Sequence, residues 1–325
     1  MSAGNGGVQT QAGARGDIHG VQRRKGLTGS DTTPMMRQYL ELKGRYADCL
    51  LLFRMGDFFE SFYDDAEKLS RILGIALTAR QKREDGTGIP LAGFPHHALD
   101  GYLARLVKAG CRVAVCEQME DPSKARGLVR RDVVEVVTPG TVMGGESLEP
   151  GAAVLLGSAA VAGDEAGLVL CDLSTGEIRC CSMDRDVLSQ ELSRTGPREL
   201  LSAPGSGIGA PPGCEMTEVE PWKFDPDHGR RLVEQRFGRG APEGFGISGS
   251  PALLGAMGAL LAYIEETKRS GLSHLEFSGS YRRDDCLIMD GETQLSLGIT
   301  RGVPGEEGAV LAEISDGTVT PGGAR

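Results

Sequence analysis

The sequence predicts a mixed α/β protein with more than one domain, and three observations support this class. The chain has 325 residues, whereas an ordinary single domain has roughly 100 to 200. Short apolar runs of strand length alternate with segments whose apolar residues recur every three or four positions, which is the period of a helix face. The content of 40% hydrophobic and 25% charged residues is typical of a globular protein.

Charge and composition exclude several classes of protein. The formal net charge of -10 argues against a surface that is basic throughout, so any contact with nucleic acid has to come from a local patch. No apolar stretch approaches the roughly 18 residues of a membrane span, and the first residues lack the apolar core of a signal peptide. We therefore expect a cytoplasmic protein without membrane association. Its eight cysteines are expected as reduced core thiols, because their spacing fits no zinc site.

The first domain is expected to follow a disordered tail. Residues 1–32 are rich in Gly, Ser, Gln and Arg and have no apolar period, so they cannot bury enough surface to offset the entropy of ordering. Thr33 and Pro34 are the residue types of a helix N-cap and first helical position, and they begin a predicted helix that runs to Tyr46. The apolar run 49–53 then predicts a buried strand.

A second helix is predicted directly after a turn at residues 54–57. Phe58 falls at the edge of its apolar stripe, about 70° from the centre if each residue advances ~100°. Phe58 is therefore a candidate for exposure, and Asp64 and Asp65 are expected as solvated charges on the helix surface. The stripe consists of Phe59, Phe62, Ala66, Leu69 and Leu73.

The remaining elements continue the α/β pattern in two units. In the first unit, glycine and proline punctuate residues 86–95, and a second unit begins near Gly151. Ser250 before Pro251 marks the start of a long apolar helix. The predicted strands cover 111–117, 133–137, 152–159, 167–172, 177–181, 199–202 and 286–290, with a hairpin turn at 173–176, and the predicted helices cover 96–109, 185–194 and 251–268, with a last helix beginning at 293–298.

Several motifs resemble, in order and spacing, the start of the bacterial MutS mismatch repair proteins. The hairpin Asp172–Gly176 looks like that of the MutS connector domain, which has an RNase H-like fold. The segments that carry the resemblance are Thr33–Met36, Leu52–Glu60, Phe62–Ala66, Gly88–His97 (GIPLAGFPHH), Glu117–Gln118 and Val137–Thr141, followed later by Tyr263–Lys268, Asp284–Asp285, Met289–Asp290 and Thr318–Pro321.

The resemblance implies four regions. A disordered tail (1–32) precedes a mixed α/β mismatch-recognition domain, MutS domain I, over 33–141. An RNase H-like α/β connector domain, MutS domain II, follows over 142–270. Residues 271–325 would be the truncated helical start of the core or lever domain.

The resemblance also implies a site. In MutS proteins a Phe-x-Glu motif enters the minor groove of kinked DNA, where the Phe stacks on the mispaired or unpaired base and the Glu hydrogen-bonds to it. These residues correspond to Phe58 and Glu60. A wedge of this kind has to unstack a base step, and that costs least where pairing is already broken. A mismatch is also more flexible than paired DNA, which explains recognition without reading the sequence.

Basic and neighbouring residues are candidates for contact with the DNA backbone. Arg54 and Met55 immediately precede the wedge, and such contacts would position it without reading sequence. The alternative is that the charged residues are simply solvated surface. The further candidates are Arg80, Lys82, Arg83 and Lys108.

No catalytic site is expected in this chain. It contains no GxxxxGK[ST] phosphate loop, and the GxGxxG match at Gly244–Gly249 follows a loop instead of a strand. The resemblance implies that ATP and magnesium bind downstream of Arg325, that the intact protein is a homodimer, and that it signals to a MutL-type partner. One alternative is a protein-interaction module that works through the connector surface. A metal-dependent nuclease is a third reading, but no convincing set of carboxylates accompanies Asp172.

Overall fold

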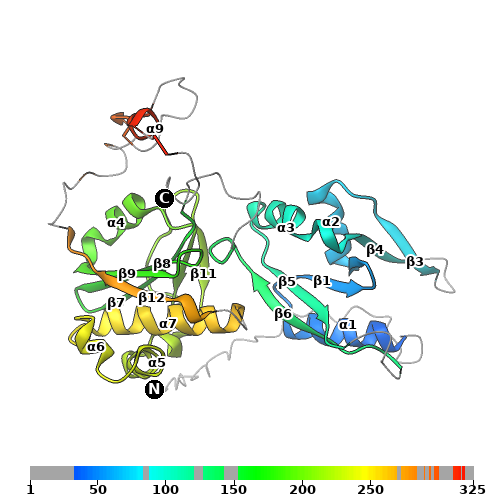
Figure 1. The fold of residues 1–325 in the computed structure, drawn as a ribbon, viewed down its shortest axis with the longest axis horizontal. Coiled ribbons are helices and arrows are strands. Elements are labelled where there is room, and N and C mark those ends of the chain that lie inside the picture. Colours follow the sequence, from blue (N-terminus) through cyan, green and yellow to red (C-terminus); the bar gives the residue numbers. More distant parts are fainter. Residues whose placement is uncertain are drawn as a thin grey trace, which may run out of the picture.

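The described parts of the chain form two α/β bodies that lie side by side, each built on a six-stranded sheet (Figure 1). The computed structural model describes residues 33–82, 88–120, 127–142, 153–268 and 272–283, with short stretches and single residues between 289 and 318. The predicted tail 1–32, and most of the strand and helix predicted over 286–298, lie outside the described residues.

The first body has the sheet order β3-β4-β2-β1-β5-β6. Helix α1 covers one face of this sheet, and α2 and α3 cover the other, because the buried side chains separate into one cluster with each set of helices. The elements are α1 (Pro34–Arg45), β1 (Leu50–Met55), β2 (Phe58–Phe62), α2 (Asp64–Leu73), β3 (Thr78–Lys82), β4 (Gly88–Pro95), η1 (His96–Ala98), α3 (Leu99–Lys108), β5 (Val113–Gln118) and β6 (Arg131–Val137).

The helix predicted immediately after residue 57 is wrong in its first part. Residues 58–62 form strand β2, and helix α2 begins only at Asp64. Strand β2 is paired antiparallel with β1 on one side and β4 on the other, so hydrogen bonding to two neighbours overrides a helical apolar spacing. Phe59 and Phe62 consequently lie in different hydrophobic clusters, on opposite faces of the sheet.

The expectation that Asp65 is a solvated charge is also wrong. Its carboxylate is buried between α1 and β1, where it accepts hydrogen bonds from Leu51 N at 3.1 Å, Lys43 Nζ at 3.0 Å and Tyr39 OH at 3.3 Å. These donors compensate the loss of hydration that burial of a carboxylate would otherwise cost. Asp64, its neighbour on the helix, is exposed as expected.

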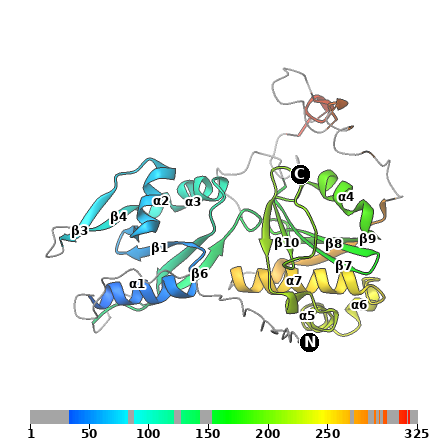
Figure 2. The same ribbon diagram turned by 180° about the vertical axis from the view of Figure 1, so that it is seen from behind.

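The second body has the sheet order β11-β10-β7-β8-β9-β12. Helices α5 and α7 lie on one face and α4 on the other, as Figure 1 and Figure 2 show from opposite sides. The elements are β7 (Leu155–Ala162), β8 (Glu165–Asp172), β9 (Glu177–Asp184), η2 (Arg185–Val187), α4 (Leu188–Thr195), β10 (Glu199–Ser202), β11 (Glu215–Glu218), η3 (Pro221–Phe224), α5 (Pro226–Phe237), α6 (Ala241–Gly244), α7 (Pro251–Thr267), η4 (Leu272–His274) and β12 (Glu276–Ser280).

The long helix predicted from Pro251 is confirmed as α7, and its sequence explains its position. Ser250 caps it by accepting a hydrogen bond from Leu253 N at 3.0 Å. Most of its residues are buried, because it crosses the sheet and also packs against α5. The predicted boundary at residue 270 falls before β12, which pairs with β9 of this same sheet.

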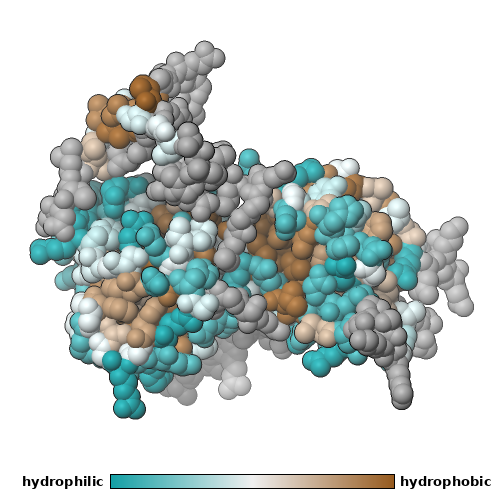
Figure 3. Space-filling model, viewed as in Figure 1, coloured by the Kyte–Doolittle hydropathy of each residue, from teal (hydrophilic) through white to brown (hydrophobic). Residues whose placement is uncertain are grey.

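A short helix, α9 (Leu311–Ser315), stands apart from the second body. Leu311 and Ile314 are exposed on it, and Figure 3, in the view of Figure 1, shows a hydrophobic group at the position of this helix.

One buried carboxylate joins the two bodies. Glu199, at the start of β10, accepts hydrogen bonds at one oxygen from Thr138 Oγ1 (2.6 Å) and Gly140 N (2.8 Å), which follow β6 of the first body. Its other oxygen accepts from Thr217 Oγ1 (2.7 Å) and Tyr263 OH (2.6 Å) of the second body. An ion pair between Glu135 and Lys268 lies at the same junction. Glu199 is therefore the centre of the contact between the bodies.

Replacing Glu199 with alanine should lower the free energy of unfolding by about 3 kcal/mol or more, because it leaves several buried donors without an acceptor. Thermal unfolding followed by circular dichroism measures this loss. Glu215→Ala is the matched control, since Glu215 is the register partner of Glu199 on β11 but is exposed. The control should change stability by no more than about 0.5 kcal/mol. Equal effects of the two substitutions would contradict this account of the junction.

Candidate functional site

A tight hairpin between β1 and β2 forms the exposed end of the first body. Gly56 adopts a φ of +59° in its turn, a conformation that favours glycine. The carbonyl oxygen of Asp57 accepts a hydrogen bond from His96 N at 2.8 Å, which ties the turn to the end of β4. The next residue, Phe58, therefore begins β2 on a backbone that is held from both sides.

Phe58 presents its ring to solvent. It is 45% exposed, whereas the adjacent Phe59 is 1% exposed, because successive side chains of a strand point to opposite faces. Its register partners are Met55 on β1 and Pro95 on β4. The predicted exposure is confirmed, but its cause is strand alternation at the uncovered end of the α1 face instead of the edge of a helix stripe.

Glu60 lies two residues along β2, so its side chain is on the same face as Phe58. Its neighbour across the sheet is Gly93, where an added Cβ would come within 2.7 Å of the Phe59 carbonyl oxygen and 3.0 Å of Glu60 Cγ. The lack of a side chain at Gly93 leaves the room that Glu60 occupies. Glycine and proline in residues 86–95 predict punctuation there and not a strand, whereas residues 88–95 form β4.

The Glu60 carboxylate is only partly compensated. The side chain is 20% exposed, and its Oε2 atom is buried with no hydrogen-bond partner among the described residues. Arg80 Nη1 on β3 lies 3.6 Å from that oxygen, which is too far for a good hydrogen bond. Desolvation raises the pKa of Glu60, and the positive charge of Arg80 opposes this rise. Among the residues that the structure describes, the face thus pairs an exposed ring with a carboxylate oxygen that lacks a donor.

The structure separates the other predicted contact residues. Met55 and Arg80 share the face of Phe58, and Arg80 Nη1 lies 3.7 Å from Met55 Sδ. Arg54 alternates to the opposite face, where it forms an ion pair with Glu117 at 3.2 Å and stacks on Phe59. Lys108 is exposed on α3, which also covers that opposite face. Lys82 belongs to β3, but its side chain and all of Arg83 lie outside the described residues.

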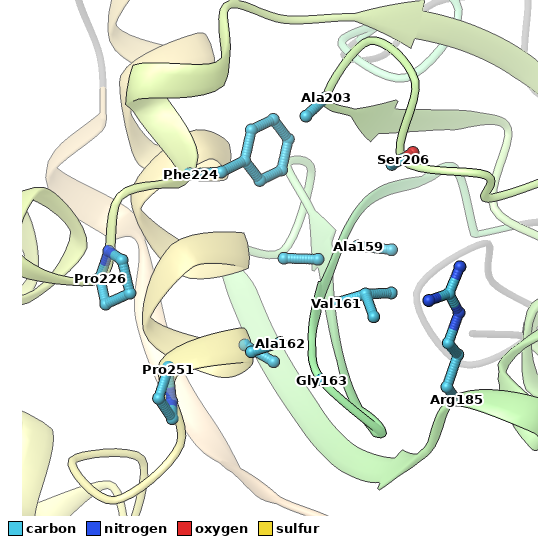
Figure 4. A pocket seen from close by; sticks show the side chains of 12 residues that line it. Ala159, Val161, Ala162, Gly163, Arg185, Ala203, Ser206, Phe224, Pro226 and Pro251 are labelled. Carbon is cyan, nitrogen blue, oxygen red and sulfur yellow. The ribbon is translucent and has the colours of Figure 1, made fainter.

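The second body contains a separate hollow of about 540 Å³. It lies beside residues 159–163 of β7, beyond the point where the pairing of β10 with β7 ends. Figure 4 shows Phe224, Pro226 and Pro251 on one side of this strand and Arg185 on the other. Its wall is mainly apolar and contains no pair of groups suited to acid–base or nucleophilic catalysis. Across the described residues, no group of three or more His, Cys, Asp or Glu side chains could hold a metal ion.

Comparison with known proteins identifies the family. A family model of MutS domain I matches residues 33–146, and one of MutS domain II matches residues 153–276. The chain belongs to the MutS family. It is 41% identical over 302 residues to the DNA mismatch repair protein MutS of Anaeromyxobacter dehalogenans (strain 2CP-C), a match that covers 90% of this chain and 34% of that protein. The chain therefore spans about a third of the length of this curated MutS relative.

The predicted family and the mixed α/β fold class are both confirmed. The two domain matches coincide with the two bodies seen in the structure, so the first body is MutS domain I and the second is MutS domain II. Among the helices that the structure describes, none has the length and apolar character needed to span a membrane.

The close approach of Gly93 to β2 gives a prediction about the site. Gly93→Ala should lower the free energy of unfolding by about 1 to 3 kcal/mol, because the new methyl group collides with the β2 backbone. Gly101→Ala is the control, since Gly101 lies within α3 with nothing near its Cβ position. That substitution should instead stabilise the chain by up to about 1 kcal/mol. Urea unfolding measures both, and an undiminished stability of Gly93→Ala would show that β2 and β4 can move apart freely.

Proposed function

We propose that this chain binds mismatched or unpaired bases in double-stranded DNA, with Phe58 as a minor-groove wedge and Glu60 as a hydrogen-bonding partner of the displaced base. The observation that carries the proposal is the pairing, on one face of a sheet, of an exposed aromatic ring with a carboxylate oxygen that has no donor within the described part of the chain. The name of the MutS relative, a DNA mismatch repair protein, supports the same function.

The Phe58 ring supplies the kinking force. An apolar wedge costs a few kcal/mol per unstacked base step, and a mismatch lowers that cost because its bases are already poorly paired. A wedge of this kind has to be held rigidly before it binds. Otherwise the conformational entropy lost when the ring is immobilised would offset the free energy gained from stacking. The hairpin turn at Gly56 and its bond to His96 provide that support.

Glu60 supplies the discrimination. A carboxylate that approaches phosphates and the acceptor atoms of the minor groove is repelled unless a base offers it a donor or shares a proton. A displaced base can do so, whereas an intact pair has already committed its hydrogen-bonding edge. The same group therefore favours mismatched DNA and disfavours paired DNA.

The wider role belongs to a longer protein. We propose that this chain is the recognition part of a cytoplasmic MutS-type ATPase, with ATP and magnesium bound outside it, homodimer formation, and signalling to a MutL-type partner through domain II. The lining of the domain II hollow gives no support to a nuclease.

Phe58→Ala should lower the preference for a G·T duplex over the matching homoduplex by about tenfold or more, because the stacking contact of a wedge with a base is worth 1 to 3 kcal/mol, on the order of that found for aromatic side chains on single strands. Fluorescence anisotropy at fixed salt, with protein up to high micromolar concentrations, gives both dissociation constants.

Trp222→Ala serves as the matched control for this substitution. Trp222 is also an exposed aromatic residue, at 57%, but it lies in domain II. Its loss should leave the preference for the mismatch unchanged. Retention of the wild-type preference by Phe58→Ala would rule out the wedge, and equal losses in both variants would point to a general effect on binding.

A further inference from the structure

Arg80 is the one described cation that opposes the Glu60 carboxylate. It comes from β3, whose pairing with β4 places it on the same face of the sheet as Glu60. Its guanidinium lies 3.6 Å from Glu60 Oε2 and its side chain is 44% exposed. The contact is therefore an ion pair at the boundary with solvent, and no residue that the structure describes donates a hydrogen bond to this carboxylate oxygen.

The surroundings of Glu60 contribute little other charge. Its register neighbours on this face are Phe53 on β1 and Gly93 on β4, and neither side chain is ionisable. Farther along the same face, Arg131 of β6 stacks over the Phe53 ring and is held by the carbonyl oxygen of Arg54. Burial has the largest effect on the pKa of Glu60 and raises it, and among the described residues Arg80 is the charged group that opposes this rise.

An ion pair of this kind is easily exchanged. Exposed pairs without ideal geometry contribute little to stability, so Arg80 can leave Glu60 at small cost. A phosphate is a better partner for a guanidinium, because its oxygens accept two parallel charge-assisted hydrogen bonds. DNA that lies against Phe58 would bring its backbone close to the exposed β3–β4 edge, which carries Arg80.

We propose that Arg80 is a positioning residue that controls the discrimination made by Glu60: it stays paired with the Glu60 carboxylate in the free protein and on fully paired DNA, and it moves to a DNA phosphate when an unpaired base donates a hydrogen bond to Glu60. The inference rests on the proposed function and deepens it. Arg80 can leave Glu60 only where a base with a free donor takes its place, so the phosphate contact of Arg80 adds to the affinity for mismatched DNA and not for paired DNA. Contact with the DNA backbone thus makes Glu60 sensitive to the pairing of the base beside it.

A double-mutant cycle tests this coupling. The measured quantity is the ratio of dissociation constants for a homoduplex and for the same duplex with one unpaired thymine, whose N3–H is free to donate to a carboxylate. Arg80→Gln should weaken binding to the duplex with the unpaired thymine more than binding to the homoduplex, and so lower this ratio by about fivefold or more, within the range measured for residues in contact. In a Glu60→Gln background, Arg80→Gln should still weaken binding but change the ratio by less than about twofold.

The control and the pH dependence separate this role from plain backbone contact. Arg71→Gln removes the same charge from the exposed side of α2, on the opposite face of the sheet, and should leave the ratio unchanged.

The wild-type ratio should fall as pH is lowered through the pKa of Glu60, because the neutral acid is no longer repelled by paired DNA. Arg80→Gln should move this fall to higher pH. If Arg80→Gln lowers the ratio equally in the wild-type chain and in the Glu60→Gln chain, the proposal is overturned.

A measurement without DNA distinguishes failure of this inference from failure of the proposed function. Carbon-13 NMR of the Glu60 carboxyl group in the free chain should show a higher titration midpoint in Arg80→Gln than in wild type, and no rise in Arg71→Gln. If wild type prefers the unpaired thymine but the midpoint does not respond to Arg80, the Arg80 inference alone fails. If wild type shows no preference, the proposed function fails whatever the midpoint does.

Discussion

The position of β2 between β1 and β4 decides which side chains of domain I reach the surface. Hydrogen bonding on both sides fixes the strand, so alternation sends Phe59 into the cluster under α2 and α3 and turns Phe58 and Glu60 toward the α1 face. Helix α1 covers the half of that face formed by β1, β5 and β6. At the Phe58 end of β2 none of the described helices covers this face, and this is where the ring and the carboxylate lie.

Three acidic residues in sheltered positions show how structural and functional carboxylates differ in this chain. Asp65 and Glu199 are buried and accept hydrogen bonds from several donors, so each holds elements together. Glu60 is half-buried, yet one of its oxygens has no donor among the described residues. Because an unsatisfied polar group costs free energy, its presence beside an exposed ring is better explained by a ligand than by stability.

The buried carboxylate of Glu199 also joins the two domains. Glu199 connects the segment that leaves β6 with β10, β11 and α7, so the first structured residues after the domain I sheet are fixed to domain II. The β1–β2 hairpin that carries Phe58 lies at the end of β1 that is away from this junction.

Helix caps, turn residues and apolar runs in the sequence were enough to predict several helices and strands. The capped helix at Pro251, the hairpin between β8 and β9, and the strand at Glu199 follow from caps, turns and apolar runs. The resemblance that identified the family also singled out Phe58 and Glu60. Strands β3, β4 and β11 were missed, because glycine and proline weaken the local signal and long-range pairing supplies the stabilisation.

The sequence by itself determined the α/β class, the family and the identity of the candidate pair. Only the tertiary structure decided that residues 58–62 are a strand, that Asp65 is buried, that Arg54 lies on the face opposite Phe58, and that Arg80 lies beside Glu60. The physical reason is that a residue's face, neighbours and solvation depend on which strands pair with its own. Those partner strands lie far away in the chain, so a local sequence pattern does not predict which of them will pair.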